Sequence, residues 1–160
     1  MSMRILPFGL SLCLFAVPAS ADILYSNGPL NGDRLGVTIS PPFSVSDSFT
    51  VSNNANASGF DFVSWDYSGD SVVDIDWSIG TTAGAGDIAS GTAALTSVLQ
   101  FTNTDGFDVY VNSGALPNLT LGVGTYYLTF QNSVTANGRA AYWDDNDGPS
   151  FRNPERCQPI

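Results

Sequence analysis

The sequence alternates apolar and polar residues over short runs, and clusters of turn-forming residues separate these runs. The clearest run is 43–51, FSVSDSFTV, in which every second residue is apolar except Asp47. A period of two residues places one set of side chains in a core and the other in water, as in a half-buried β-strand. After residue 21, no segment has a sustained apolar period of 3.6 residues. The chain is therefore predicted to be all-β.

Further runs of this character follow along the chain. They cover residues 59–67, 72–79, 87–94, 96–102, 106–112, 124–132 and 138–143. In the run 72–79, the side chains expected to face the core are Val73, Ile75, Trp77 and Ile79. About nine short strands at this spacing indicate a single antiparallel β-sandwich with a jelly-roll-like arrangement. An open barrel is the alternative.

The first 21 residues have the layout of a secretory signal peptide. Arg4 precedes an apolar run from Ile5 to Val17, and the segment ends in the small residues Ala19, Ser20 and Ala21. This pattern predicts cleavage before Asp22 and export to the periplasm, the cell surface or the extracellular space. The apolar run is shorter than the roughly 20 residues that a helix needs to cross a bilayer. No stable membrane span is expected in the mature chain.

Composition narrows the chemistry that the chain can perform. It has 15 acidic and 5 basic residues, no His, and a formal net charge of −10. Without His, the Ser/His/Asp and Cys/His catalytic groups and His-based zinc sites are excluded. With so few cations there is no basic patch to neutralise phosphates, so no nucleic-acid partner is expected. Only Cys157 follows the predicted cleavage point, so no disulfide forms within the mature chain.

Six phrases occur in an order that resembles a known family. They are YSNGPLNG (25–32), FSVSDSFTV (43–51), DIDWSI (74–79), SGTAALT (90–96), GTYYLTFQN (124–132) and YWDDNDGPS (142–150). The set resembles exported β-sandwich proteins that carry a PEP-CTERM sorting signal in exopolysaccharide-producing Gram-negative bacteria, and it covers nearly all of residues 22–150. The resemblance implies sorting to the cell surface alongside exopolysaccharide. It implies no residue-level site.

Residues 151–160 differ in composition from the residues before them. This tail, FRNPERCQPI, contains Arg152, Arg156, Cys157 and the only Glu of the chain. In the family, the domain is followed by another strand and a sorting segment with a Pro-Glu-Pro motif, an apolar helix and a basic end, which the tail lacks. We expect a frameshift or premature stop near residue 150. The predicted organisation is a signal peptide (1–21), a β-sandwich domain (22–150) and an atypical C-terminal tail (151–160).

Aromatic residues on mixed or outer strand faces are candidates for contact with sugars. Exposed aromatic rings offer a large apolar area at little entropic cost, and Tyr and Trp add a polar group. Trp77 alternates with Ile75 and Ile79 and is assigned to the core instead. Packing within the sandwich is the alternative role for the others. The candidate glycan-binding residues are Trp65, Tyr67, Tyr110, Tyr127 and Trp143.

An oxygen-rich run near the end of the domain is a candidate calcium site. It comprises Asp144, Asp145, Asn146 and Asp147, followed by Gly148. Ca²⁺ takes six to eight oxygen ligands from flexible loops, which this composition suits. The run departs from the EF-hand pattern, because Tyr142 occupies the place of the first acid and no Glu follows at the required distance. A polar β-turn is the alternative, and no other cofactor is expected.

Paired carboxylates raise the possibility of glycoside hydrolysis. Asp74 and Asp76 share one face of a strand, and Asp66 and Asp70 are close in sequence. The reaction needs two carboxyl groups at a set separation in a cleft, and nothing in the sequence indicates a cleft. We therefore predict no enzymatic activity. The leading hypothesis is a non-catalytic exported surface or matrix protein associated with exopolysaccharide, and the alternative is a carbohydrate-binding module of β-sandwich type.

Overall fold

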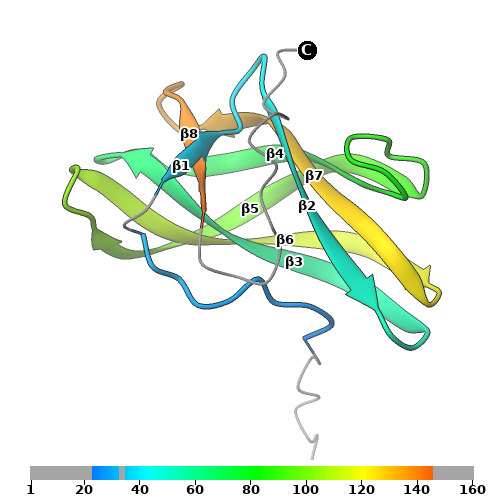
Figure 1. The fold of residues 1–160 in the computed structure, drawn as a ribbon. Helices are drawn as coiled ribbons and strands as arrows, with labels where there is room; N and C mark the ends of the chain where they lie inside the picture. Colours follow the sequence, from blue (N-terminus) through cyan, green and yellow to red (C-terminus); the bar gives the residue numbers. More distant parts are fainter. Residues whose placement is uncertain (1–22, 33–34, 146–160) are drawn as a thin grey trace, which may run out of the picture.

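The structure is a computed structural model that describes residues 23–32 and 35–145, and these residues contain eight β-strands (Figure 1). The strands are β1 (Gly36–Thr38), β2 (Ser44–Val51), β3 (Ala55–Tyr67), β4 (Val72–Gly80), β5 (Ala89–Thr102), β6 (Phe107–Leu121), β7 (Gly124–Thr135) and β8 (Ala141–Asp144). Within this part of the chain, no helix is long and apolar enough to cross a membrane. The predicted signal peptide (1–21) and C-terminal tail (151–160) lie outside the described residues.

The strand pairing has the nested order of a jelly roll. Strand β1 pairs with β8, β2 with β7, β3 with β6 and β4 with β5, all antiparallel. Such nesting arises when an antiparallel ribbon folds over on itself. The pairs β3–β8 and β4–β7 then widen the ribbon into two layers, β1-β8-β3-β6 and β5-β4-β7-β2. The predicted antiparallel all-β fold is confirmed, with eight strands in the described residues where about nine were expected.

One long strand joins the two layers. Residues 89–94 of β5 pair with β4, and residues 95–102 pair with β6. The two strands expected at 87–94 and 96–102 are therefore a single strand, and it makes the sheet nearly closed, like a barrel. Along residues 95–102, no described strand pairs with the second edge of β5.

The core lies between the two layers and is centred on Phe130 of β7. Its ring centroid is 4.9 Å from that of Phe60 and 4.6 Å from that of Phe62, both on the opposite layer. Aromatic pairs at these separations and tilted angles are favourable beyond the area that they bury. The packing of Phe130 therefore connects β7 to β3 across the sandwich.

The alternation in β4 is confirmed in part. Ile75, Trp77 and Ile79 are buried as expected, but Val73 is exposed and Val72 is buried in its place. The ladder between β4 and β7 has register shifts between Val72 and Asp74, and between Asp74 and Asp76. A shift of one residue moves a side chain to the other face of a sheet, and this shift makes the prediction for Val73 wrong.

Candidate functional site

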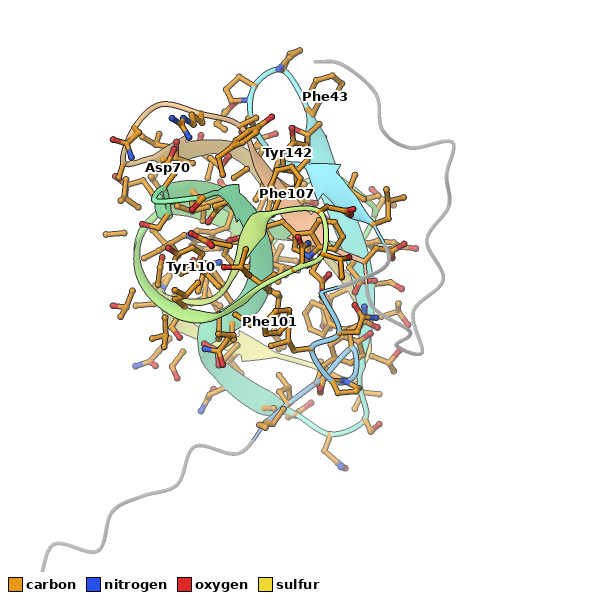
Figure 2. All side chains as sticks on the ribbon, turned by 90° about the vertical axis from the view of Figure 1, so that its left-hand side faces the viewer. Phe43, Asp70, Phe101, Phe107, Tyr110 and Tyr142 are labelled. Atoms are coloured by element: carbon orange, nitrogen blue, oxygen red, sulfur yellow. The ribbon has the colours of Figure 1, made fainter. Side chains whose placement is uncertain are left out.

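Aromatic side chains from three strands meet at one end of the sandwich. Tyr67 ends β3, Phe107 begins β6 and Tyr142 lies on β8. The ring centroids are 5.1 Å apart for Tyr67 and Phe107, 5.6 Å for Phe107 and Tyr142, and 6.4 Å for Tyr67 and Tyr142. Figure 2 views this end and labels Phe107 and Tyr142. We call Tyr67, Phe107, Tyr142 and the neighbouring Arg139 the aromatic ledge.

The pairing of the strands explains why these rings meet. Tyr67 is the register partner of Phe107 across β3 and β6, so their side chains point to the same face. Trp65, two residues earlier on β3, is the partner of Tyr142 on β8, which brings Tyr142 diagonally next to Tyr67. The cluster therefore depends on pairings between residues about 40 and 75 positions apart.

The aromatic ledge carries polar groups as well as rings. The guanidinium carbon of Arg139 lies 5.8 Å from the centroid of the Tyr67 ring, within the range of a cation–π contact. The hydroxyl oxygens of Tyr67 and Tyr142 are 3.5 Å apart. This hydroxyl contact, together with burial, raises the pKa of Tyr142, so its phenol is protonated at neutral pH. Arg139 is exposed, and Tyr67 keeps 39% of its surface accessible.

Trp65 supports the aromatic ledge from below rather than lining it. Its side chain is buried, and its ring centroid is 6.2 Å from that of Phe107. Its indole Nε1 donates a hydrogen bond of 2.7 Å to Oδ1 of Asp144. The backbone N–H of Gly32 faces Oδ2 of the same carboxylate at 3.4 Å. Trp65 is therefore fixed in place and does not present a free face to a ligand.

The other candidate glycan-binding residues lie elsewhere. Trp143 points to the interior and packs against Phe130, with ring centroids 4.8 Å apart. Tyr127 lies on β7 in the other layer, where it pairs with Ser48 and Gly80. Tyr110 pairs with Ser64, on the inner side of β6. Of the five predicted residues, the structure places only Tyr67 at the surface of the aromatic ledge, with Trp65 beneath it.

A buried polar network lies on the inner face of the same end. Ser64 Oγ donates to Asp66 Oδ2 at 2.9 Å, and Asn112 Nδ2 donates to Ser64 Oγ at 2.8 Å. Ser97 Oγ is 2.7 Å both from Asn112 Oδ1 and from the carbonyl oxygen of Val72. Buried polar groups are nearly always paired in this way. The network ties β3, β6, β5 and β4 together.

Within this network, Asp66 is the residue whose hydrogen bonding is least complete. It is fully buried, and its Oδ1 has no hydrogen-bond partner in the described part of the chain. Burial, reinforced by the charges of Asp70 and Asp108, raises the pKa of Asp66 to about 6, against hydrogen bonds from Ser64 and Val72 that lower it. Asp66 is fully buried, so its carboxyl group is not exposed to solvent in the folded chain.

The two neighbouring carboxylates are held by turns. Burial raises the pKa of Asp70, but hydrogen bonds from the backbone N–H groups of Asn137 and Ser71 outweigh it and lower the pKa overall. The N–H of Gly69 and the hydroxyl of Thr102 donate to Asp108 and lower its pKa. Both acids therefore accept hydrogen bonds from residues of the turns and strand ends at this end, where Figure 2 labels Asp70.

The remaining predicted carboxylate sites are only partly described. Asp76 accepts hydrogen bonds from Thr92 (2.5 Å) and Asn132 (3.0 Å), which occupy both of its oxygens. Asn146 and Asp147 of the predicted calcium site lie outside the described residues. Within residues 23–32 and 35–145, no group of three or more His, Cys, Asp or Glu side chains is arranged to hold a metal ion. Calcium binding by Asp144, Asp145, Asn146 and Asp147 stays a prediction.

Three residues of the aromatic ledge were not predicted as a site from the sequence. Phe107 alternates with valines, a pattern that predicts a core position. Arg139 is an isolated charged residue in a turn. Tyr142 is one of many aromatic residues in the chain, and nothing in its local sequence distinguishes it. Only the strand register brings them to Tyr67. Comparisons with family models, with curated proteins and with solved structures find no match to this chain.

Proposed function

We propose that this chain is a non-catalytic exported protein of the cell surface or extracellular matrix, and that it associates with extracellular polysaccharide through the aromatic ledge. The observation that carries the proposal is the cluster of the exposed Tyr67 with the half-buried Phe107 and Tyr142, beside the exposed Arg139. The resemblance to PEP-CTERM proteins and the signal-peptide pattern of residues 1–21 support export alongside exopolysaccharide.

The chemistry of the aromatic ledge suits a sugar. A saccharide has apolar C–H faces and a rim of hydroxyl groups, and amphipathic aromatic side chains match both. The rings of Tyr67, Phe107 and Tyr142 offer apolar surface. Two phenol hydroxyls and the guanidinium group offer hydrogen-bond donors at its border.

The charge of the chain favours a neutral polysaccharide over an acidic one. Arg139 is the only Lys or Arg among the described residues, whereas the whole chain has a net charge of −10. A polyanion would be repelled at long range and would find one cation at close range. We therefore infer that the ligand is a glycan with hydroxyl groups and few or no carboxylates.

Affinity gel electrophoresis of the purified chain against a panel of neutral and acidic polysaccharides tests the proposal. Retardation by at least one neutral polysaccharide is expected, with a loss of at least tenfold in apparent affinity for Tyr142→Ala and for Tyr67→Ala. Tyr127→Ala, a tyrosine on the opposite layer, is the matched control and should bind like the parent. No retardation by any polysaccharide, or equal losses for the control, would overturn the proposal.

A further inference from the structure

Two connections between strands carry most of the aromatic ledge. Tyr67 is the last residue of β3 and precedes the connection 68–71, which leads to β4. Arg139 lies in the connection 136–140 between β7 and β8, and Tyr142 follows it. The distance between Tyr67 and Arg139 therefore depends on how these two connections are placed relative to each other.

Each connection is closed by its own hydrogen bonds. The backbone N–H of Asp70 donates to the carbonyl of Tyr67 at 2.8 Å. In the other connection, the hydroxyl of Thr135 donates to the carbonyl of Arg139 at 2.8 Å, and the N–H of Gly138 donates to the carbonyl of Thr135 at 3.2 Å. Tyr67 is therefore held to the first connection and Arg139 to the second.

The carboxylate of Asp70 joins the two connections. Its Oδ1 accepts hydrogen bonds of 2.9 Å from the N–H of Ser71 and from the N–H of Asn137, which is 67 positions away. The Nδ2 group of Asn137 donates in the other direction, to the carbonyl of Gly69 at 3.0 Å. Figure 2 shows Asp70 at the same end of the sandwich as Phe107 and Tyr142.

The burial and charge of Asp70 make this link strong. The residue is 2% exposed, and hydrogen bonds to a carboxylate are stronger than those between neutral groups. By contrast, the contact that depends on the link is sensitive. The guanidinium carbon of Arg139 lies 5.8 Å from the centroid of the Tyr67 ring, close to the limit of about 6 Å for a cation–π interaction. A small displacement of either connection therefore breaks it.

We propose that Asp70 is a positioning residue of the proposed glycan site, because its carboxylate joins the two connections and so holds Arg139 against Tyr67. This inference rests on the proposed function of the aromatic ledge. Asp70 is buried and touches no ligand. It acts by fixing the groups that do, as hydrogen bonds behind a binding site generally do.

Affinity gel electrophoresis of Asp70→Ala and Asp70→Asn tests this proposal, with Asp87→Ala as the control. Asp87 accepts hydrogen bonds of 2.8 and 2.7 Å from the N–H and hydroxyl of Thr81, at the other end of β4. Asp70→Ala should lose about tenfold in apparent affinity for the polysaccharide that retards the parent. Asp70→Asn keeps one acceptor oxygen, so it should bind like the parent, as should the control.

The NMR shift of the Arg139 side-chain protons gives a readout that needs no ligand. Protons above the face of an aromatic ring are shifted upfield by its ring current. This upfield shift should be lost in Asp70→Ala and in Tyr67→Ala, and it should persist in Asp70→Asn and Asp87→Ala. Asn137→Ala removes only the exposed bond to Gly69, so it should reduce both the shift and the affinity in part.

The outcomes separate this inference from the proposed function. An unchanged shift and affinity in Asp70→Ala would overturn the positioning role, and equal losses in Asp87→Ala would do the same. If Asp70→Ala does not fold, unchanged readouts in Asn137→Ala would overturn it. A parent that no polysaccharide retards, with the shift lost in Asp70→Ala alone, would overturn the proposed function and support the positioning of Arg139 by Asp70.

Discussion

The indole Nε1 of Trp65 on β3 donates a 2.7 Å hydrogen bond to Oδ1 of Asp144 on β8, which joins residues 79 positions apart in the sequence. Both side chains are buried. Burial raises the pKa of Asp144, and the hydrogen bonds from Trp65 and Gly32 act in the opposite direction. The bond therefore satisfies a carboxyl group that would otherwise be costly to bury, directly beneath the aromatic ledge.

Replacing Trp65 by Phe should destabilise the domain by about 1–3 kcal/mol, because it leaves Asp144 Oδ1 buried without that donor. Urea unfolding followed by circular dichroism measures the change. Tyr67→Phe removes only a surface hydroxyl contact of 3.5 Å and should change the free energy of unfolding by less than about 0.5 kcal/mol. Equal effects of the two substitutions would show that the bond to Asp144 contributes nothing specific.

The buried Asp66 predicts that the domain is more stable in mild acid than at neutral pH. The pKa of Asp66 is about 6 in the folded state against an ordinary value of 3.8, so the folded state binds the proton more tightly. The contribution of Asp66 to the free energy of unfolding is fully present below pH 3.8. It declines as the pH rises through 6. A shift of about two pKa units corresponds to about 3 kcal/mol, as an order of magnitude.

Urea unfolding at pH 5 and pH 8 measures this dependence, with Asp66→Asn as the comparison variant. The amide cannot ionise, so the variant should lose the part of the decline that Asp66 causes and should be more stable than the parent at pH 8, while any contribution from the raised pKa of Asp144 persists. The lowered pKa values of Asp70 and Asp108 act in a separate range, since their stabilisation is lost only below pH 3.8. A parent chain that is more stable at pH 8 than at pH 5 would contradict the prediction.

Gly114 of β6 is predicted to tolerate no side chain. A Cβ atom there would collide with the ring of Phe60 and lie 3.0 Å from a methyl carbon of Leu95. Since Phe60 packs on Phe130, Gly114→Ala should displace the ring and cost about 1–3 kcal/mol. At Gly122 an added Cβ has no neighbour closer than 3.8 Å, so Gly122→Ala should be neutral or slightly stabilising when both variants are compared by urea unfolding.

The sequence predicted most of the strands but not the site; β1 matches no predicted run, and β5 was predicted as two strands. Alternation depends on neighbouring residues, so the run 43–51 predicted β2 well, and Trp77 was correctly assigned to the core. Strand ends were less predictable. Strand β6 continues to Leu121, beyond the expected 106–112, because its pairing with β3 extends the ladder through residues without clear alternation.

The aromatic ledge could not be predicted from local pattern. Tyr67 was expected at a sugar contact, but its neighbours come from strands far along the chain, and their register depends on the whole fold. Trp65 and Trp143 were predicted to contact sugars, but both pack against other aromatic rings of the fold. Each lies in an alternating run with apolar residues on both faces, so the sequence alone could not show which face would be covered.

Calcium remains a testable prediction for Asp144, Asp145, Asn146 and Asp147. Asp144 already accepts the Trp65 and Gly32 donors, so an ion would have to use its remaining lone pairs together with other oxygens of the run. A ligand that binds only the folded state raises Tm with concentration. If the run binds Ca²⁺, millimolar Ca²⁺ should raise Tm in the parent chain, Mg²⁺ should raise it less, and Asp145→Asn should reduce the Ca²⁺ effect. An unchanged Tm at millimolar Ca²⁺ would leave this run as a polar turn.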